Sequence, residues 1–561
     1  MKWHFADVFE TVANLVPDGI AVIHGETRRT WRDYEDRAAR VAQALAEAGL
    51  GPNSKVALYG YNSSEYLEAQ FGVFKLRGVP VNVNYRYVEH ELVYLFDNAD
   101  AEAVVFDARF APRLAAILGQ LPKLTTYIEI DDGSGEHLEG ATRLEDVIAS
   151  HGRLPRQDYE EDDIYMLYTG GTTGMPKGVM YRQGDFVKGL GMAGLGPDAP
   201  QTAEGLAATV LALKKTGAAP ISVPACPLMH GTGLWLGAFL PHILGGTAVT
   251  FNNEHFHADA LWALVAKEKA TAVVIVGDAF AKPMLAALKA AAARGEGHDL
   301  SALKQIISSG VMFSTEVKMG LLEMADVAIM DAMGSTEGSM GSSVVSRAAP
   351  PGETARFIKN PTTKVFNADD EEVVPGSDQI GMIANGGFAP IGYFKDPEKS
   401  AATFRVISGQ RYSFPGDFAK VATDGSLILL GRGSVCINTG GEKVFPEEVE
   451  EALKAHSSVW DALVVGVPDE RFGERVTAVV SARPGHAVDE AAVVAFARDR
   501  LASYKMPRTV IVVDEVRRAA NGKADYKWAK GVALGEGGRA KRFVSRPVAS
   551  RFGIRTPIGE A

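Results

Sequence analysis

Short runs rich in β-branched residues alternate with amphipathic helical patterns over the first half of the chain. VALYG (56–60), VPVNVN (79–84), AEAVVFD (101–107), TAVVIVG (271–277) and KQIISSG (304–310) each lie next to an Ala/Leu-rich helical pattern. Strands that alternate with helices of this length favour βαβ units and a mostly parallel sheet. The pattern predicts an α/β fold.

The pattern changes twice further along the chain. From about Thr354 the sequence becomes turn-rich, with short strands. A second helical pattern, FPEEVEEALKAH (445–456), then opens a compact segment that contains the apolar runs 463–469 and 477–483. The pattern therefore predicts a compact segment of strands and helices in the C-terminal part.

The longest uncharged run, residues 231–251, is long enough to cross a membrane. It contains five glycines, Pro241 and His242, and a Gly-Gly pair divides it into a helix-like piece and a β-rich piece. We therefore expect a buried helix followed by a buried strand. The N-terminus carries Asp7 and Glu10 where a signal peptide needs an unbroken apolar stretch, so a cytoplasmic location is expected.

Composition narrows the possible classes of protein further. The chain has 561 residues, of which 46% are hydrophobic and 23% are charged, which is ample for a large core without metal or disulfide support. The net charge of −11 argues against a general nucleic-acid binder. Two cysteines, Cys226 and Cys436, are too few for a secreted disulfide framework and read as thiols in a reducing compartment.

The strongest chemical signal follows the apolar run 164–168. Glycines allow backbone N–H groups to approach a polyphosphate closely, hydroxyls add donors, and a lysine neutralises charge. The loop is not a Walker A motif, because Gly178 follows Lys177 where that motif requires serine or threonine. The candidate phosphate-binding residues are Thr169, Gly170, Gly171, Thr172, Thr173, Gly174 and Lys177.

This loop resembles the phosphate loop of the adenylate-forming enzymes, which include acyl-CoA synthetases, peptide-synthetase adenylation domains and luciferases. Further stretches resemble the other motifs of that family, in the same order. They are DAMGSTEG (331–338), YSFPGD (412–417), GRGS (431–434), TGGEKVFP (439–446) and ANGK (520–523).

The resemblance implies a large N-terminal domain, residues 1–430, made of mainly parallel sheets flanked by helices together with a small β-barrel-like subdomain. It also implies a hinge at 431–435 and a small, mobile α+β domain at 436–561. No transmembrane segment is expected, and a homodimer is among the oligomeric states left open.

The resemblance also implies roles for individual residues. Glu337 would hold the Mg²⁺ that bridges the ATP phosphates, as a hard cation prefers one carboxylate plus phosphate oxygens. Asp417 would accept hydrogen bonds from the ribose, and Arg432 would contact the ribose or the phosphates. Lys523 would reach the acyl and phosphate oxygens, and His230 would lie beside the acyl carboxylate. Further residues implied in catalysis or in binding ATP and coenzyme A are Gly310, Asp331, Met333, Gly334, Ser335, Thr336, Gly440 and Lys443.

Two positions depart from the family pattern. Met333 stands where the family usually stacks a tyrosine on adenine, which implies a softer thioether–ring contact. Ser434 stands at a hinge position that is often aspartate. Neither change removes a charge that the phosphates or the metal need.

The sequence around these motifs, including PIGYFKDPEKSAATFR (390–405), resembles that of actinobacterial-type acyl-CoA synthetases for long-chain fatty acids and steroid side-chain carboxylates. The implied reaction joins a small-molecule carboxylic acid to coenzyme A through an acyl-adenylate, with release of AMP and pyrophosphate. Gly233 and Gly237 in the run after His230 are expected to leave width for a bulky acyl group.

Two alternatives stay open. One is an acyl-AMP ligase that loads a carrier protein, and product formation with free coenzyme A would distinguish it. The other is a catalytically silent nucleotide-binding protein, against which the joint presence of Glu337, Asp417 and Lys523 argues.

Overall fold

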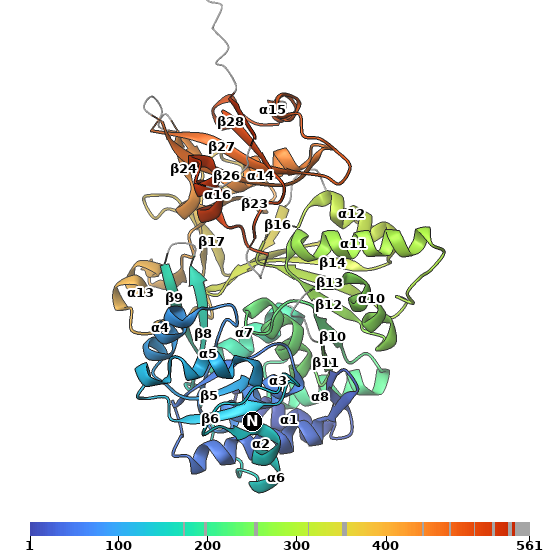
Figure 1. Ribbon diagram of the computed structural model, residues 1–561, viewed down its shortest axis with the longest axis vertical. Coiled ribbons are helices and arrows are strands. Elements are labelled where there is room, and N and C mark those ends of the chain that lie inside the picture. Colours follow the sequence, from blue (N-terminus) through green and yellow to red (C-terminus); the bar gives the residue numbers. More distant parts are fainter. Residues whose placement is uncertain are drawn as a thin grey trace, which may run out of the picture. The chain divides into compact units, whose positions relative to one another are not determined.

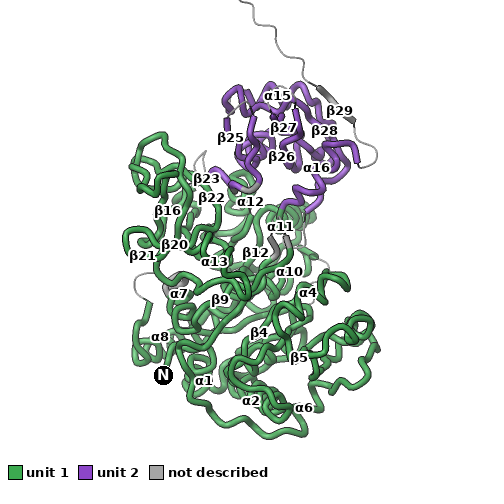
Figure 2. Tube along the Cα trace, turned by 90° about the vertical axis from the view of Figure 1, so that its left-hand side faces the viewer, with its two compact units in different colours: residues 1–429, 520–523 green, residues 430–519, 524–561 purple. Residues whose placement is uncertain are grey.

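The structure is a computed structural model that describes residues 1–171, 174–195, 199–251, 256–311, 313–350, 356–439, 442–469, 473–498, 500–518, 522–536 and 541–544. The chain divides into two compact units (Figure 2). Unit 1 contains residues 1–429 together with 520–523, and unit 2 contains residues 430–519 together with 524–561. The function of 431–435 as a hinge stays a prediction.

A parallel sheet forms in the N-terminal part of unit 1, with the strand order β4-β3-β5-β6-β7. Its strands β5 and β6 are labelled in Figure 1. A helix follows β3 and another follows β4, so the predicted βαβ alternation is confirmed here. The strands are β3 (Lys55–Tyr59), β4 (Val79–Asn82), β5 (Ala101–Asp107), β6 (Thr126–Ile130) and β7 (Thr142–Arg143).

A larger sheet contains a second parallel series in the order β1-β11-β10-β12-β13-β14, bordered by the antiparallel strands β2 and β15. The strands are β1 (Ile20–His24), β2 (Thr27–Thr30), β10 (Ile221–Pro224), β11 (Thr247–Thr250), β12 (Ala272–Ile275), β13 (Gln305–Ser309), β14 (Ala328–Ser335) and β15 (Gly338–Val345). The strands β11 and β12 are buried at every position, as expected where helices cover a parallel sheet.

Antiparallel strands continue this sheet beyond β15, in the order β16-β23-β22-β18-β21-β20, and β17 pairs with β18. This is the turn-rich region that the sequence predicts from about Thr354. The strands are β16 (Arg356–Lys359), β17 (Thr363–Phe366), β18 (Gly381–Asn385), β20 (Phe404–Ile407), β21 (Gln410–Ser413), β22 (Asp417–Val421) and β23 (Leu427–Arg432).

A third, small sheet carries the predicted phosphate loop. The strands β8 (Ile164–Gly171) and β9 (Gly174–Arg182) form an antiparallel hairpin, and β19 (Gly392–Tyr393) pairs with β9. Two segments more than 200 residues apart in the sequence are thus hydrogen-bonded side by side.

Some helices of unit 1 begin at side-chain caps. Thr30 and Asp33 form a capping box at α2, and the Ser63 hydroxyl accepts from the backbone of Tyr66 at α3. The α-helices are α1 (Phe5–Leu15), α2 (Trp31–Glu47), α3 (Ser64–Lys75), α4 (Glu89–Ala99), α5 (Ala111–Ala115), α6 (Leu144–Ser150), α7 (Gln183–Leu195), α8 (Ala203–Thr216), α9 (Leu240–Ile243), α10 (Ala258–Lys267), α11 (Gly277–Ala293), α12 (Thr315–Met324) and α13 (Pro397–Thr403).

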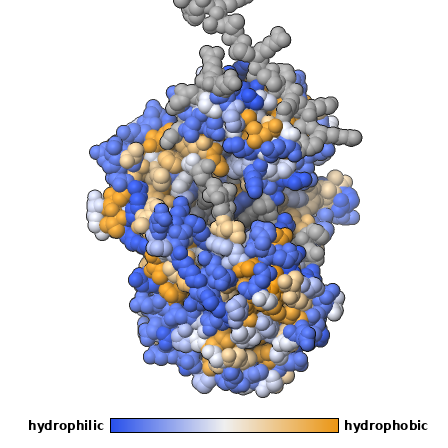
Figure 3. All heavy atoms as spheres, turned by 60° about the vertical axis from the view of Figure 1, so that its left-hand side comes forward, coloured by the Kyte–Doolittle hydropathy of each residue, from blue (hydrophilic) through white to orange (hydrophobic). Residues whose placement is uncertain are grey.

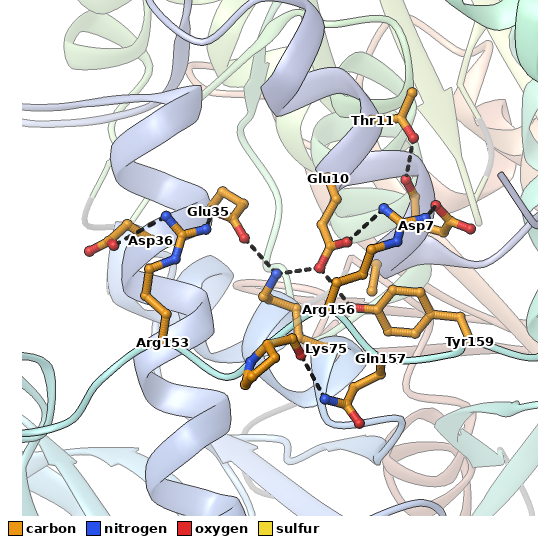
Figure 4. A network of polar contacts seen from close by, with 12 residues as sticks. Asp7, Glu10, Thr11, Glu35, Asp36, Lys75, Arg153, Arg156, Gln157 and Tyr159 are labelled. Carbon is orange, nitrogen blue, oxygen red and sulfur yellow. Dashed lines mark hydrogen bonds and ion pairs between the residues drawn. The ribbon is translucent and has the colours of Figure 1, made fainter.

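The core of unit 1 also encloses charged side chains (Figure 4). The Lys75 ammonium, 2% exposed, donates to the carboxylates of Glu10 and Glu35. The Tyr159 hydroxyl donates to the same Glu10 carboxylate at 2.7 Å. Because each buried charge has an opposite partner, the desolvation penalty is offset.

The uncharged run 231–251 is folded as predicted, as a buried helical segment followed by a buried strand. Residues Thr232–Phe239 form a π-helix, η4, which continues into α9 and then β11. In the part of the chain that the structure describes, no helix is both long and apolar enough to cross a membrane. On the face shown in Figure 3, hydrophobic residues lie in scattered patches on a mainly hydrophilic surface.

Unit 2 is built on the long hairpin β26–β27, with parallel strand β28 beside β27. Two of its helices, α14 and α16, cover β26. Its elements are β24 (Ile437–Thr439), β25 (Glu442–Val444), α14 (Pro446–Lys454), β26 (Val459–Asp469), β27 (Gly473–Ala482), α15 (Glu490–Arg498), β28 (Thr509–Val513), α16 (Tyr526–Leu534) and β29 (Lys541–Val544).

Candidate active site

The predicted phosphate loop is the tip of the β8–β9 hairpin. Across the hairpin Thr169 pairs with Lys177, and Gly171 pairs with Gly174. Residues 172–173, the two predicted threonines between the strands, lie outside the described residues. The hairpin fixes the Lys177 backbone opposite the first threonine of the loop.

Asn82, at the end of β4, connects this hairpin to the segment before His230. Its amide nitrogen donates to the carbonyl oxygens of Tyr168 at 2.9 Å and Met229 at 2.7 Å, and its amide oxygen accepts from the Tyr168 N–H at 2.6 Å. Asn82 is only 8% exposed. One buried amide therefore sets the position of the phosphate loop relative to His230.

Lys177 is held by a segment far along the chain. Its ammonium donates to an Asp396 carboxylate oxygen at 2.8 Å and lies 5.6 Å from the ring centre of Tyr393. The Lys177 ammonium, first, and the Lys399 backbone N–H hold the pKa of Asp396 below its ordinary value. The lysine remains about one-third exposed, at 36% of its side chain.

The predicted metal-binding carboxylate lies in the turn between β14 and β15. Glu337 Oε1 accepts from the Tyr393 hydroxyl at 2.8 Å. The Tyr181 hydroxyl donates to the carbonyl oxygen of Thr336 at 2.9 Å, and the Glu337 N–H donates to the Ser335 hydroxyl. Tyrosines from β9 and β19 thus hold this turn against the phosphate-loop sheet.

Asp331, predicted in cofactor binding, forms a buried ion pair. Its carboxylate accepts from the Lys318 ammonium at 2.9 Å, and their side chains are 9% and 5% exposed. Burial raises the pKa of Asp331, and the Lys318 charge opposes that shift. The pair ties β14 to α12, which gives Asp331 a structural partner independent of any nucleotide.

Met333, predicted to cover adenine, is 7% exposed and belongs to a hydrophobic cluster with Met340 and Phe357. Its contact with the base stays a prediction. Asp417, at the first position of β22, is 9% exposed. Its role toward the ribose also stays a prediction.

His230 is half-buried and lies two residues before the start of η4. Burial, as the largest cause, together with the positive charges of Lys523 and Arg86 lowers its pKa to about 3. The imidazole is therefore neutral near pH 7. A neutral ring can donate or accept one hydrogen bond beside a carboxylate without adding charge.

Gly522, the residue before the predicted catalytic Lys523, lies against α11. Gly522 has φ +72°, and a Cβ there would lie 2.8 Å from the Ala279 Cβ. Only glycine meets both requirements, so the residue before Lys523 is fixed by backbone conformation and by space.

The remaining predicted residues are placed only in part. Gly310 directly follows β13 with φ +94°, and a Cβ built there would lie 3.8 Å from Thr232 Oγ1 of η4. Arg432 ends β23 and Lys443 lies in β25, both in unit 2, and Gly440 lies outside the described residues.

One expectation is wrong. Gly233 and Gly237 do not line an open pocket, because both are buried against the chain that leaves β10. A Cβ on Gly233 would lie 2.4 Å from the Pro227 carbonyl oxygen, and one on Gly237 would lie 2.6 Å from the Pro224 Cβ. These glycines allow η4 to approach the sheet. The partly exposed positions of η4 carry Thr232, Trp235 and Leu236.

Sequence reasoning missed four residues of this site: Asn82, Tyr181, Tyr393 and Asp396. The sequence gives only a weak indication for Asn82. It is a polar residue at the carboxyl end of a buried strand, and ligands often bind at the carboxyl ends of parallel strands. Tyr393 and Asp396 lie in the segment PIGYFKDPEKS (390–400), which by sequence alone indicates only a resemblance to acyl-CoA synthetases.

Together, these residues are suited to binding a polyphosphate. A glycine-rich hairpin with a lysine, a fixed carboxylate and a neutral histidine can bind a polyphosphate and its cation beside an uncharged hydrogen-bonding ring. Comparison with known proteins agrees. Residues 9–388 match the AMP-binding enzyme family, and residues 448–523 match the AMP-binding enzyme C-terminal domain.

The chain belongs to the AMP-binding enzyme family. A 3-oxocholest-4-en-26-oate–CoA ligase of Rhodococcus rhodochrous is a 41% identical AMP-binding relative, over 94% of this chain and 96% of the relative. A medium/long-chain-fatty-acid–CoA/3-oxocholest-4-en-26-oate–CoA ligase of Mycobacterium tuberculosis is 42% identical over 94% of this chain and 95% of the relative.

Solved AMP-binding enzymes share the fold. The anthranilate CoA ligase AuaEII in complex with anthranoyl-AMP has a TM-score of 0.82 at 22% identity, over 95% of this chain and 98% of the other. ATP-bound MatB from Rhodopseudomonas palustris has a TM-score of 0.76 at 26% identity, over 95% and 99%. The predicted α/β fold class, with a large sheet domain and a smaller C-terminal domain, is confirmed.

Proposed function

We propose that this AMP-binding enzyme is an AMP-forming acid–thiol ligase that converts a bulky hydrophobic carboxylic acid into its coenzyme A thioester. The observation that carries the proposal is the junction of the β8–β9 hairpin with the β14–β15 turn. There, Tyr393 contacts Glu337 directly and lies beneath Lys177. A cation and a carboxylate are thereby held together at a glycine-rich loop, as a metal–polyphosphate complex requires.

The donor set at this junction fits magnesium. Within the described residues, no three His, Cys, Asp or Glu side chains are grouped to hold a metal. Mg²⁺ is usually bound through one or two carboxylates plus substrate phosphates and water, rather than by a protein cage. Glu337 supplies such a carboxylate, with Oε1 oriented by Tyr393. When bound, the ion would neutralise charge on the phosphates.

In the first half-reaction, an oxygen of the acid's carboxylate attacks the α-phosphorus of ATP, and the bond to pyrophosphate breaks. Lys177 and Lys523 reduce the repulsion between the two anions, Asp417 holds the ribose, and Arg432 contacts the ribose or the phosphates. His230, neutral because its pKa is lowered to about 3, hydrogen-bonds the acid. Such catalysis consists of positioning and electrostatic stabilisation.

In the second half-reaction, the coenzyme A thiol sulfur attacks the acyl carbon, the thiol proton is released, and AMP leaves. The small domain exchanges Lys523 for the face around Gly440 and Lys443. No protein nucleophile takes part.

The class of acid rests on two observations. The named relatives act on a steroid side-chain carboxylate and on medium- or long-chain fatty acids. The partly exposed face of η4 carries Trp235 and Leu236, which suit an apolar acyl group rather than acetate. The proposal includes a cytoplasmic location. Size-exclusion chromatography would decide whether the protein is a homodimer.

The test is an ATP–pyrophosphate exchange assay with acetate, benzoate, octanoate, palmitate and 3-oxocholest-4-en-26-oate, followed by detection of the thioester with free coenzyme A. Exchange and thioester formation with palmitate or the steroid acid are expected. A preference for acetate would overturn the acid class. Exchange without thioester would favour the carrier-protein alternative, and no exchange with any acid would favour the silent one.

A further inference from the structure

The segment 391–400 contacts both charged groups of the ATP site. The backbone N–H of Ile391 donates to the carbonyl of Met180, and that of Phe394 donates to the carbonyl of Gly178, each at 2.8 Å. The segment is thereby fixed along β9. Its side chains then reach Lys177 on β9 and Glu337 on the larger sheet.

We propose that the 391–400 segment is a positioning element of the ATP site, in which Tyr393 orients the Glu337 carboxylate and Asp396 fixes the Lys177 ammonium. The proposal rests on the proposed function and adds two residues to it.

The Tyr393 contact suits a carboxylate that must bind a cation. A phenol donates one hydrogen bond and carries no charge near neutral pH, so it orients Glu337 Oε1 without neutralising the negative charge. A lysine or arginine in its place would compete with the cation. Tyr393 itself is held in place, since it is 7% exposed and its ring centre lies 5.3 Å from that of Phe404. The backbone N–H of Tyr393 also donates to the Ser400 hydroxyl.

The Asp396 contact constrains the other charge. One carboxylate oxygen accepts from the Lys399 N–H as the N-cap of α13, and the other accepts from Lys177. Because the cap fixes the carboxylate, the flexible lysine is directed to one position. A lysine held in place loses less side-chain entropy when phosphates bind.

The two partner residues also connect separate parts of the fold. Glu337 follows β14 of the large sheet, whereas Lys177 lies in the hairpin sheet. The spacing of these opposite charges therefore depends on contacts between the sheets. Tyr393, on the third strand of the hairpin sheet, makes such a contact.

The first test is Tyr393→Phe, which keeps the ring and removes only the hydroxyl. We expect the Mg²⁺ concentration for half-maximal pyrophosphate exchange to rise by about 10-fold, the lower end of effects from losing a group that orients a metal ligand. The kcat at saturating Mg²⁺ should change by less than about twofold. Titration of Mn²⁺ into enzyme with α,β-methylene-ATP, followed by electron paramagnetic resonance, should show the same weakening without turnover.

A matched control is Tyr159→Phe. It removes a hydroxyl that donates to the Glu10 carboxylate at 2.7 Å, from a ring that is 2% exposed and outside the ATP motifs. This variant should lose stability and keep the wild-type metal dependence. The proposed role of Tyr393 is overturned if Tyr393→Phe also keeps the wild-type metal dependence. It is equally overturned if both variants shift the metal dependence by the same amount.

Asp396→Asn tests the second contact. Asparagine retains the N-cap and loses the charge that faces Lys177. We expect KM for ATP to rise about threefold or more, with KM for the acid unchanged. A fall in KM for ATP would show that Asp396 competes with the phosphates, and would overturn its positioning role.

The outcomes separate this proposal from the proposed function. If the wild-type enzyme forms no adenylate with any acid, the ligase proposal fails, while the Mn²⁺ titration with α,β-methylene-ATP still tests Tyr393. Wild-type protein that binds no Mn²⁺ in that titration would overturn both.

Discussion

The amide of Asn82 bonds the backbone of Tyr168 in both directions, as donor at 2.9 Å and as acceptor at 2.6 Å. The same amide also holds the carbonyl of Met229. A single buried side chain therefore joins the parallel five-stranded sheet, the phosphate-loop hairpin and the residue before His230.

Asn82→Asp should be severely destabilising. The carboxylate would replace two donated hydrogen bonds with repulsion from two carbonyl oxygens in a buried place. We expect a loss of about 3 kcal/mol in the free energy of unfolding, measured by urea titration. Asn98→Asp is the control, because Asn98 only accepts from the Tyr168 hydroxyl and aspartate retains that role. Similar losses in both would contradict the assignment.

Gly237→Ala should destabilise the protein without changing its choice of acid. The new Cβ would lie 2.6 Å from the Pro224 Cβ, an overpacking that costs about 1–3 kcal/mol. The kcat/KM values for acetate and palmitate should fall together. Gly191→Ala, in α7 where a Cβ has open space, should be neutral or stabilising. If instead kcat/KM fell for palmitate and not for acetate, the result would show that Gly237 lines the acyl pocket.

Lys318→Met should cost about 3–5 kcal/mol, because it leaves the buried Asp331 carboxylate without its partner. The double variant Lys318→Met/Asp331→Leu should recover most of that loss, since both charges are removed. KM for ATP measured on the double variant then isolates any contact of Asp331 with nucleotide. An unchanged value would confine Asp331 to its structural pair.

Lys523→Ala should reduce adenylate formation by about 100-fold, near the ~3 kcal/mol typical of losing one electrostatic stabiliser. The same variant, given preformed acyl-adenylate and coenzyme A, should form thioester at a near-normal rate. Paired single-turnover assays with circular dichroism measure both steps. Equal losses in both half-reactions would contradict domain alternation, and no loss in either would remove Lys523 from catalysis.

His242 should make the protein less stable in acid. Burial lowers its pKa from 6.5 to about 4, and its Nε2 lies 3.0 Å from the Ala21 carbonyl oxygen. Between these pKa values the unfolded chain binds a proton that the folded chain does not, so the contribution is present above pH 6.5 and is lost as the pH falls toward 4. The loss reaches about 3 kcal/mol.

The matched variant is His242→Gln, which keeps a donor for Ala21. The difference in free energy of unfolding between wild type and variant, measured by urea titration from about pH 7 to pH 4, should shift steadily against the wild type. A constant difference would show that His242 does not titrate in this range.

The sequence by itself determined the class of fold and which residues are candidates for binding and catalysis. Strand and helix periods are local properties, so runs such as 56–60 and 101–107 predicted the parallel strands β3 and β5. The loop around Lys177 could be found because backbone approach, hydroxyls and charge must occur together within a few residues to bind phosphate. The motif ending at Glu337 was found through its resemblance to a motif of the family. The buried nature of 231–251 followed from the glycines and Pro241 within it.

Only the tertiary structure decided which of these residues meet. The contacts of Tyr393 with Glu337 and of Asp396 with Lys177 span 56 and 219 residues, and no local pattern encodes a pairing at such separations. The tertiary structure also reversed the interpretation of Gly237. A glycine in a sequence indicates only that space is needed, and the position of Pro224 shows that the sheet, rather than a substrate, occupies that space.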